Sequence, residues 1–450
     1  MSVTTEILPE NFSYLIDKYN YNVPRYTSFP PITHWEKTTE IERWLEDVKL
    51  SIKDTGKDGI AIYVHLPFCE KLCTFCACNK YITTNHAVEE EYMKYVIREL
   101  EFWGKSLGRV PCKHIYYGGG TPTFFKPYLL KKLTSEILAH FPLKDGAFLC
   151  YEANPNYTSF EHIIEMREAG FTRISFGIQE LNEKVAIAIN RPTNINNLKK
   201  LIKIARELDY ENINFDIIYG LPFQTVASIK RTINILLELE PDSITFYSYA
   251  HVPWKGRGQR KFKEEDLPPP HIKFLIFLTG KKILEENGFY WIGLDHFVKE
   301  TDRLFLAYKN SKLTRNFMGY TEKFSDILIG VGTSAISSTP SSYFQNNPDL
   351  HQYYRSADSL ILAPYRYYHL SPVEITIKNK IIELMCYLRT SIKNTELPEN
   401  IYNGIVERLC ELQNDLLIDL NEGQVSVTPS GRYFLRVIAS AFDFYYKPTY

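Results

Sequence analysis

Ile60-Ala-Ile-Tyr-Val-His-Leu66 and the loop after it, Cys69-Glu-Lys-Leu-Cys73-Thr-Phe-Cys76-Ala-Cys78, set the architecture of this chain. The first segment is an apolar run with the length of a buried strand. The loop then places four cysteines within ten residues. Thiols this dense exceed what packing requires, and they indicate a shared metal centre or a redox role.

The spacing of Cys69, Cys73 and Cys76 leaves three and then two residues between neighbouring cysteines. A loop of this length can supply three thiolates to a 4Fe–4S cluster, which usually takes four. One iron then stays open, just as a catalytic zinc ion keeps one free position. An open iron can bind a small chelate such as the amino and carboxylate groups of a methionine.

Three other kinds of site also use closely spaced cysteines. A structural zinc site normally needs a second Cys or Cys/His pair, whereas the remaining cysteines, Cys112, Cys150, Cys386 and Cys410, are scattered. A disulfide framework is typical of short secreted chains. A thioredoxin-like redox motif uses CxxC, which Cys73 and Cys76 do match.

Composition narrows the class of protein. The length of 450 residues predicts two domains, and 44% hydrophobic with 23% charged residues is ordinary for a globular protein. A net charge of −1 argues against a nucleic-acid partner. The N-terminus shows no signal peptide, and no apolar run has membrane-spanning length, so we expect a cytoplasmic protein with reduced thiols and no membrane partner.

Six strand–helix units follow one another from Ile60. Each apolar strand precedes a segment with helical periodicity, which predicts a parallel sheet with right-handed crossovers. The fold class is therefore α/β, as an incomplete (β/α)6 barrel or an open sheet. The expected strands are 60–66, 114–117, 148–151, 173–176, 213–218 and 243–249.

The flanking regions differ in pattern. Residues 1–50 are expected to form an N-terminal arm, with helices near 11–19 and 38–52, and residues 51–340 the catalytic barrel with lid elements. Residues 341–450 are expected to form a covering domain. It begins with Tyr-rich, irregular sequence at 343–368 and continues in a winged-helix-like order of two helices, a hairpin and a helix over 433–444. No basic recognition helix stands out, so covering is favoured over DNA binding.

Polar and glycine residues follow the predicted strands. Gly118-Gly-Gly-Thr-Pro122 lets backbone approach a ligand closely, although an ordinary tight turn has the same composition. Glu152, Gln179, Asp216 and Ala250 end later strands. Carboxyl ends of parallel strands meet at one edge, so we expect these residues beside the cysteine loop.

The chain resembles the radical S-adenosylmethionine (SAM) enzymes and, within them, the oxygen-independent coproporphyrinogen III oxidases. The resemblance is carried by the cysteine loop with Gly118–Pro122, and it runs almost the full length. The further matching segments are Pro24–Ser28, Gly177–Gln179, Asp216–Pro222, Asp295–Phe297, Arg315–Thr321 and Gly332–Ile336.

The resemblance implies roles for single residues. Cys69, Cys73 and Cys76 ligate the 4Fe–4S cluster, and a first SAM lies near Tyr63, Gly119, Glu152 and Ile336. The family has a second SAM position, whose lining maps onto Phe75, Gly120, Thr121, Gln179, Arg191, Asp216 and Ala250. Two local alternatives remain: Glu152 as a helix N-terminal anion, and Asp216 as a structural carboxylate paired with Arg191.

The implied reaction is the oxidative decarboxylation of two propionates of coproporphyrinogen III to the vinyl groups of protoporphyrinogen IX. A 5′-deoxyadenosyl radical takes a β-hydrogen, carbon dioxide leaves, and an acceptor takes the last electron. The catalytic candidates are Cys78, as a fourth thiol that could equally be a small buried residue, and Arg315. Arg25, Arg260 and Lys261 are further candidate cations for the substrate carboxylates.

The resemblance also implies a monomer and a low-potential electron donor such as flavodoxin or ferredoxin. Two rival functions stay open: a related radical SAM enzyme acting on heme, and a heme-trafficking chaperone, whose relatives usually carry Phe at the position of Cys78. One departure from the family pattern is Met318, where well-known members have Gln. This change removes a hydrogen bond worth about 1 kcal/mol if that side chain touches a ligand.

Overall fold

The centre of the molecule is a run of six parallel strands. The structure, a computed structural model, describes residues 12–55, 59–254, 256–323, 325–359 and 362–447. The strands are hydrogen-bonded neighbours in chain order, which confirms the predicted (β/α)6 half of the fold. They are β2 (Ile60–Leu66), β5 (Cys112–Gly119), β6 (Leu143–Ala153), β7 (Arg173–Gln179), β8 (Asn212–Tyr219) and β9 (Ser243–Ser248).

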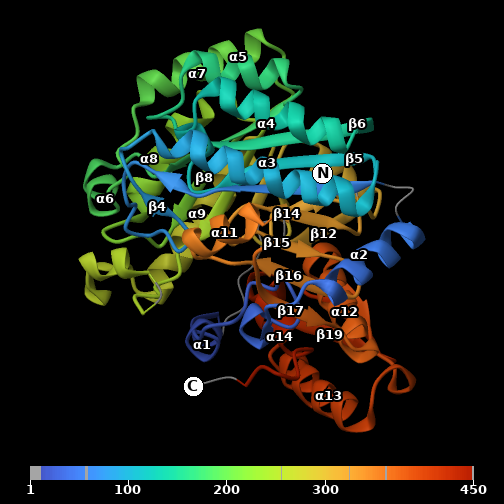
Figure 1. Cartoon of the computed structure of the whole chain (residues 1–450). Coiled ribbons are helices and arrows are strands. Elements are labelled where there is room, and N and C mark those ends of the chain that lie inside the picture. Colours follow the sequence, from blue (N-terminus) through green and yellow to red (C-terminus); the bar gives the residue numbers. More distant parts are fainter. Residues whose placement is uncertain (1–11, 56–58, 255, 324, 360–361, 448–450) are drawn as a thin grey trace.

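Helices follow the strands and cover the outside of the sheet (Figure 1). Their apolar residues recur every three or four positions; Leu198, Leu201 and Ala205, for example, are all buried. Two of the helices begin with a capping box, at Ser159 and at Thr225. The helices are α3 (Val88–Leu107), α4 (Pro127–His140), α5 (Phe160–Glu168), α6 (Glu183–Ala188), α7 (Ile195–Glu207) and α8 (Val226–Leu237).

The cysteine loop leaves the carboxyl end of β2. Its base is closed because β3 (Phe68–Cys69) pairs in parallel with β4 (Tyr81–Ile82). In the register between β2 and β5, Leu66 lies opposite Gly119, so the loop and the glycine turn leave the sheet side by side. The cysteine loop and the glycine turn are therefore neighbours, as the sequence predicts.

Within the described ranges the sheet extends well beyond the six central strands, to thirteen strands. On the β2 side, β14 pairs in parallel and the strands beyond it are antiparallel. Beyond β9, two short antiparallel strands complete the other edge. The added strands are β14 (Leu328–Val331), β15 (Ile336–Ser338), β16 (Ser342–Asn346), β17 (Pro364–His369), β1 (Glu36–Lys37), β11 (His296–Val298) and β10 (Tyr290–Ile292).

The expectation of irregular structure over 343–368 is wrong. Strands β16 and β17 enclose α11 (Leu350–Asp358), and both strands belong to the main sheet. Aromatic residues face each other across these strands, with Tyr343 opposite Tyr368 and Phe344 opposite Tyr367. Cross-strand aromatic pairs stabilise a sheet, so the tyrosine content indicated strands rather than a loop.

The last hundred residues have the predicted order of helix, helix, hairpin and helix. The elements are α12 (Pro372–Tyr387), β18 (Arg389–Ser391), α13 (Glu399–Asn414), β19 (Ile418–Asn421), β20 (Gln424–Val427) and α14 (Leu435–Ser440). The last helix begins two residues later than predicted, because a 3-10 turn occupies Gly431–Phe434, and it ends at Ser440. The division of the chain into domains at residues 50 and 340 stays a prediction.

The first and last described segments of the chain pack against each other. Helix α1 (Phe12–Lys18) lies beside α14 (Figure 1), and Phe12, Leu15 and Val23 share one buried cluster with Leu435 and Ile438. The remaining elements are α2 (Glu42–Thr55), α9 (Pro270–Glu286), α10 (Arg303–Lys309), β12 (Leu313–Asn316) and β13 (Gly319–Glu322). None of the described helices combines the length and apolar character that crossing a membrane requires.

Candidate active site

Two pockets meet at the carboxyl ends of the central strands. The cysteine pocket, of about 630 Å³, is lined by the cysteine loop, the glycine turn and the ends of β6, β7 and β8. The barrel pocket, of about 580 Å³, lies inside the barrel. Four predicted site residues line both pockets: Cys78, Gly119, Glu152 and Asp216.

The cysteine loop holds its thiols toward the cysteine pocket. Cys69 Sγ lies 3.2 Å from Thr121 Oγ1, and the Nη1 of Arg191 donates to Cys73 Sγ at 3.7 Å. The ammonium group of Lys80 donates to the carbonyl oxygens of Cys76 and Cys78 at 3.1 and 3.2 Å. The predicted ligands are therefore gathered on one wall, beside two cations.

This donor set fits a 4Fe–4S cluster. Burial raises the pKa of the Cys69 thiol to about 11, so a nearby cationic metal is needed to hold it as a thiolate at neutral pH. Across the described ranges, no group of three His, Cys, Asp or Glu side chains converges on a point where one metal ion could sit. A cubane binds each thiolate at a different iron, so its ligands surround it instead of converging.

The glycine turn lies against the backbone of the cysteine loop. The N–H of Gly120 donates to the carbonyl of Leu66 at 2.9 Å. A Cβ at Gly120 would lie 2.6 Å from the carbonyl oxygen of Pro67, and a Cβ at Gly119 would lie 2.7 Å from the His65 ring. The turn therefore requires glycine for a close approach of two backbone segments, which an ordinary tight turn does not need.

Arg191 and Gln179 form a further part of the wall of the cysteine pocket. The Nη2 of Arg191 donates to the carbonyl of Gly177 at 2.7 Å, and its buried Nε has no hydrogen-bond partner among the described residues. Gln179 adopts a φ of +72°, which is uncommon for a residue with a side chain. An unpaired guanidinium N–H suits the carboxylate of a bound ligand.

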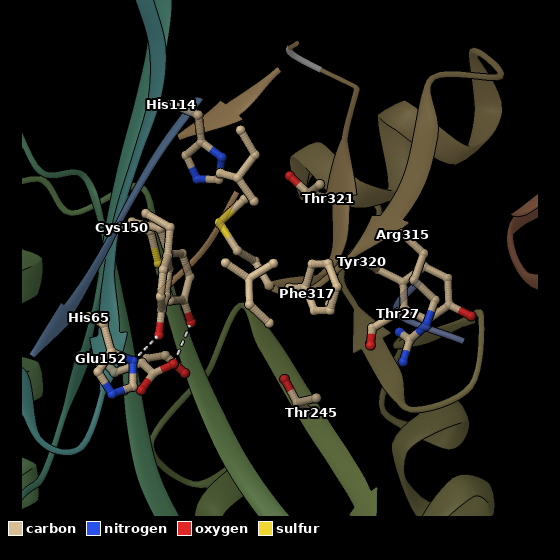
Figure 2. Close-up of a pocket in the computed structure, with 18 of the residues that line it drawn as sticks. Thr27, His65, His114, Cys150, Glu152, Thr245, Arg315, Phe317, Tyr320 and Thr321 are labelled. Atoms are coloured by element: carbon tan, nitrogen blue, oxygen red, sulfur yellow. Dashed lines mark hydrogen bonds between the residues drawn. The ribbon is translucent and has the colours of Figure 1, made fainter. Parts of the chain in front are cut away.

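Tyr63, His65 and Glu152 lie together on one side of the barrel pocket. The Tyr63 hydroxyl donates to His65 Nδ1 at 3.1 Å, and His65 Nε2 donates to the carbonyl of Asn79 at 3.0 Å, which together define one tautomer. Burial lowers the pKa of His65 to about 4, so the imidazole is neutral. In Figure 2, Arg315 and Thr27 lie across the pocket from Glu152 and His65.

Among the described residues, Glu152 is one of two carboxylates that line both pockets. Burial, and then the nearby charge of Asp216, raise its pKa to about 7, although Tyr116 donates to its Oε1 at 2.9 Å. Asp216 accepts hydrogen bonds from Ser175 Oγ at 2.8 Å and Asn214 Nδ2 at 2.9 Å. The hydrogen bonds of Arg191 go to Cys73 and Gly177, so the alternative pairing of Arg191 with Asp216 is not present.

A ladder of polar side chains crosses the floor of the barrel pocket. Thr245 Oγ1 donates to Asn214 Oδ1 at 3.2 Å, and Asn214 Nδ2 donates to Ser175 Oγ at 2.8 Å. None of these three residues belongs to the predicted site. Their signal was available as polar residues two positions apart within apolar strands, as at Asn214 and Asp216, because such residues share one face of a strand.

Other residues line the barrel pocket without having been predicted as site residues, although His296 lies in the matching segment Asp295–Phe297. Tyr116, Tyr247 and His296 line the barrel pocket, as do Arg173 and Arg303. The guanidinium of Arg303 lies 4.9 Å from the ring centre of Phe148. Arg173 is the first residue of β7, four residues before the matching segment Gly177–Gln179, but no motif includes it.

Two of the predicted cations reach the barrel pocket. Arg315 is 5% exposed, and its Nε donates to the backbone carbonyl of Arg25 at 3.2 Å. The guanidinium of Arg25 bonds to the carboxylate of Asp295. Burial alone would raise the pKa of Asp295, but the hydrogen bond from His296 and the charge of Arg25 hold it well below its usual range. Asp295 therefore stays ionised and fixes the arm.

The other predicted residues divide between the pockets and the surface. Ile336 and Met318 line the barrel pocket, and Phe75, Thr121 and Gln179 line the cysteine pocket. In the part of the chain that the structure describes, three predicted residues contribute to the lining of neither pocket and are exposed on one loop: Ala250, Arg260 and Lys261.

Comparison with known proteins places this geometry in context. The model of the Radical SAM superfamily matches residues 63–236. The oxygen-independent coproporphyrinogen III oxidase of Synechocystis is 34% identical over 442 residues, covering 96% of this chain and 94% of that protein. The enzyme of the same description from Pseudomonas aeruginosa is 34% identical, with coverage of 96% and 95%.

A solved structure gives the same result. Coproporphyrinogen III oxidase from Escherichia coli, described as a radical SAM enzyme, matches with a TM-score of 0.88 at 30% sequence identity. The match covers 95% of this chain and 100% of that one. The similarity therefore includes the arm and the C-terminal helices as well as the barrel.

Proposed function

Because the chain belongs to the family of oxygen-independent coproporphyrinogen III oxidases within the radical SAM superfamily, we propose that it converts coproporphyrinogen III to protoporphyrinogen IX in heme biosynthesis. The observation that carries this proposal is the shared wall of the two pockets. Glu152, Gly119 and Cys78 face the cysteine pocket on one side and the barrel pocket on the other. A cofactor in the cysteine pocket and a substrate in the barrel pocket can therefore come into contact without passing through bulk water.

The cofactors divide between the pockets. Cys69, Cys73 and Cys76 would hold the 4Fe–4S cluster, and a first SAM would lie at Tyr63, Gly119, Glu152 and Ile336. When bound, the cluster and SAM supply a 5′-deoxyadenosyl radical able to remove a hydrogen atom from a propionate β-carbon. Support for a second SAM comes from the cysteine pocket, whose lining contains the predicted residues Phe75, Gly120, Thr121, Gln179, Arg191 and Asp216.

The protein's own groups orient the substrate and keep water out. Arg315 presents a nearly buried guanidinium to the barrel pocket, and Arg25 lines the same pocket from the arm. A guanidinium pairs with a carboxylate through two parallel hydrogen bonds. These two residues therefore hold substrate carboxylates, while the arm covers the pocket and limits the entry of water.

Glu152 has a separate role in this proposal. With a pKa raised to about 7, it can carry or give up a proton at neutral pH. In the ionised form it accepts hydrogen bonds from an ammonium or a ribose hydroxyl at the wall between the pockets. Tyr116 holds the carboxylate in place through its hydroxyl.

The proposal includes a monomer in the cytoplasm that receives electrons from a low-potential donor such as flavodoxin or ferredoxin. Reductive cleavage of SAM requires an electron from outside the chain, and the family resemblance supports this class of donor. The sequence identity of 34% over 96% of the chain supports the substrate assignment.

The direct test is an anaerobic assay with reconstituted enzyme, SAM, a reductant and coproporphyrinogen III. We expect carbon dioxide, protoporphyrinogen IX and 5′-deoxyadenosine to form together. The matched control is the Cys112→Ser variant, which changes a buried thiol outside both pockets. Turnover should survive this change and be lost in Cys73→Ser. Cleavage of SAM without decarboxylation of this substrate would contradict the proposal and favour another tetrapyrrole.

A further inference from the structure

A third pocket lies where the two ends of the chain meet the barrel. This seam pocket, of about 220 Å³, is walled by the arm at Tyr19–Arg25, by the first turns of α9, and by the segment Arg432–Val437. The ends of β8 and β9 form its floor at Tyr219 and Ser248. Among the residues that the structure describes, it shares only Arg25 with the barrel pocket and none with the cysteine pocket.

Four cationic side chains line the seam pocket: Arg25, Lys273, Arg432 and Arg436. They come from three parts of the chain that only the fold brings together. Lys273 donates to the carbonyl of Tyr249 at 2.6 Å, and Arg436 donates to the carbonyl of Val23 at 3.0 Å. Both cations are therefore held in place by neutral backbone groups.

Negative charge in this pocket is sparse. Asp295 is the one carboxylate among the described lining residues, and it is already bonded to Arg25 and next to His296. Neither Lys273 nor Arg436 is bonded to a carboxylate among the described residues. Burial, with the neighbouring charges of Arg436 and Arg25, lowers the pKa of Lys273 to about 8. Among the described lining residues, four cationic side chains thus share this small hollow with a single carboxylate.

The rest of the lining suits a small, flat or branched anion. Aromatic side chains form much of the wall, including Phe274, Trp291 and Tyr433. The guanidinium of Arg432 lies 3.9 Å from the ring centre of Trp291, which fixes its plane. Lys273 also lies in the first turn of the 17-residue helix α9, where the helix dipole favours negative charge.

We propose that the seam pocket is a binding site for a small anion carrying carboxylate or phosphate groups. The hollow, at 220 Å³, is less than half the size of the 580 Å³ barrel pocket, so it takes a free anion or one carboxylate arm of a larger molecule. A ligand there contacts the arm, α9 and the C-terminal segment at once. It therefore holds the arm, and with it Arg25, against the barrel.

The test is calorimetric titration of the reconstituted full-length enzyme with inorganic phosphate and with citrate, and separately with coproporphyrin III. Wild-type protein should bind phosphate or citrate, and Lys273→Met should weaken that binding about tenfold or more, because a charge-assisted hydrogen bond is lost. Added salt should weaken binding as well. Lys282→Met is the matched control, since Lys282 is on the same helix but is exposed and pairs with Glu286.

A charge-keeping variant separates binding from folding. Lys273→Arg should retain anion binding, and thermal melting should show that all variants are folded. If coproporphyrin III alone binds more weakly to Lys273→Met, the anion is a carboxylate of the tetrapyrrole. Equal affinities of Lys273→Met and Lys282→Met for every probe would overturn the proposal. These binding measurements do not depend on turnover. They can therefore be interpreted even if the enzyme does not catalyse the proposed reaction.

Discussion

Replacing Gly120 by alanine tests whether the glycine turn exists for close backbone approach. The new Cβ would lie 2.6 Å from the carbonyl carbon and oxygen of Pro67, where ordinary contact begins at 3.4 Å. Pro67 leads directly into the cysteine loop, so relief of the clash must displace that loop or the turn. Overpacking of this kind costs about 1–3 kcal/mol. Loss of the hydrogen bond from Gly120 to Leu66 adds about 1 kcal/mol.

The assay combines urea unfolding of the reconstituted protein with iron content and SAM affinity. We expect Gly120→Ala to unfold at lower urea, to hold less iron and to bind SAM more weakly. Gly404→Ala is the control, because Gly404 lies inside α13 and a Cβ there meets nothing within 4 Å. This control should gain about 0.5–1 kcal/mol from reduced backbone entropy. A Gly120→Ala protein with wild-type stability, iron content and SAM affinity would refute the reasoning.

Three further predictions follow from the site and the core. Cys73→Ser should lose iron and turnover together, measured by iron analysis and the anaerobic assay. Arg315→Met should lower kcat/KM for coproporphyrinogen III by about tenfold to a hundredfold, since a buried charged hydrogen bond is removed, whereas exposed Arg389→Met should not. Burial raises the pKa of Glu99 from 4.5 to about 7. Between these two pH values Glu99 holds a proton in the folded state but not in the unfolded state. The free energy of unfolding should therefore fall by about 3 kcal/mol as the pH rises from the lower value to the higher.

The Glu99 effect can be isolated by comparison with Glu99→Gln. This variant cannot ionise, so urea unfolding from about pH 5 to about pH 8 should lack the wild-type slope. Its absolute stability will also change, because Glu99 accepts hydrogen bonds from Gly332, Asn346 and Tyr353. An identical pH slope in both proteins would show that Glu99 is not the group that titrates.

The sequence by itself determined the six central strands and the position of the cysteine loop. Each strand is a short apolar run followed by a helix with apolar residues every three or four positions, and such periodicity depends only on near neighbours. The ten residues from Cys69 to Cys78 likewise indicate a shared metal centre or a redox role without information from the rest of the chain. The rule that carboxyl ends of parallel strands meet then placed Glu152 and Asp216 beside the loop.

Only the tertiary structure decided how distant segments complete the pockets. Arg25 and Arg315 are 290 residues apart and are brought together by the packing of the arm, while Arg260 and Lys261, which have the same charge, lie exposed on a loop. The strands at 342–346 and 364–369 pair with each other across an intervening helix, and they were missed because the register that places Tyr343 opposite Tyr368 joins residues distant in sequence. Such contacts depend on the closure of long loops around a shared core, which a local pattern of residues does not encode.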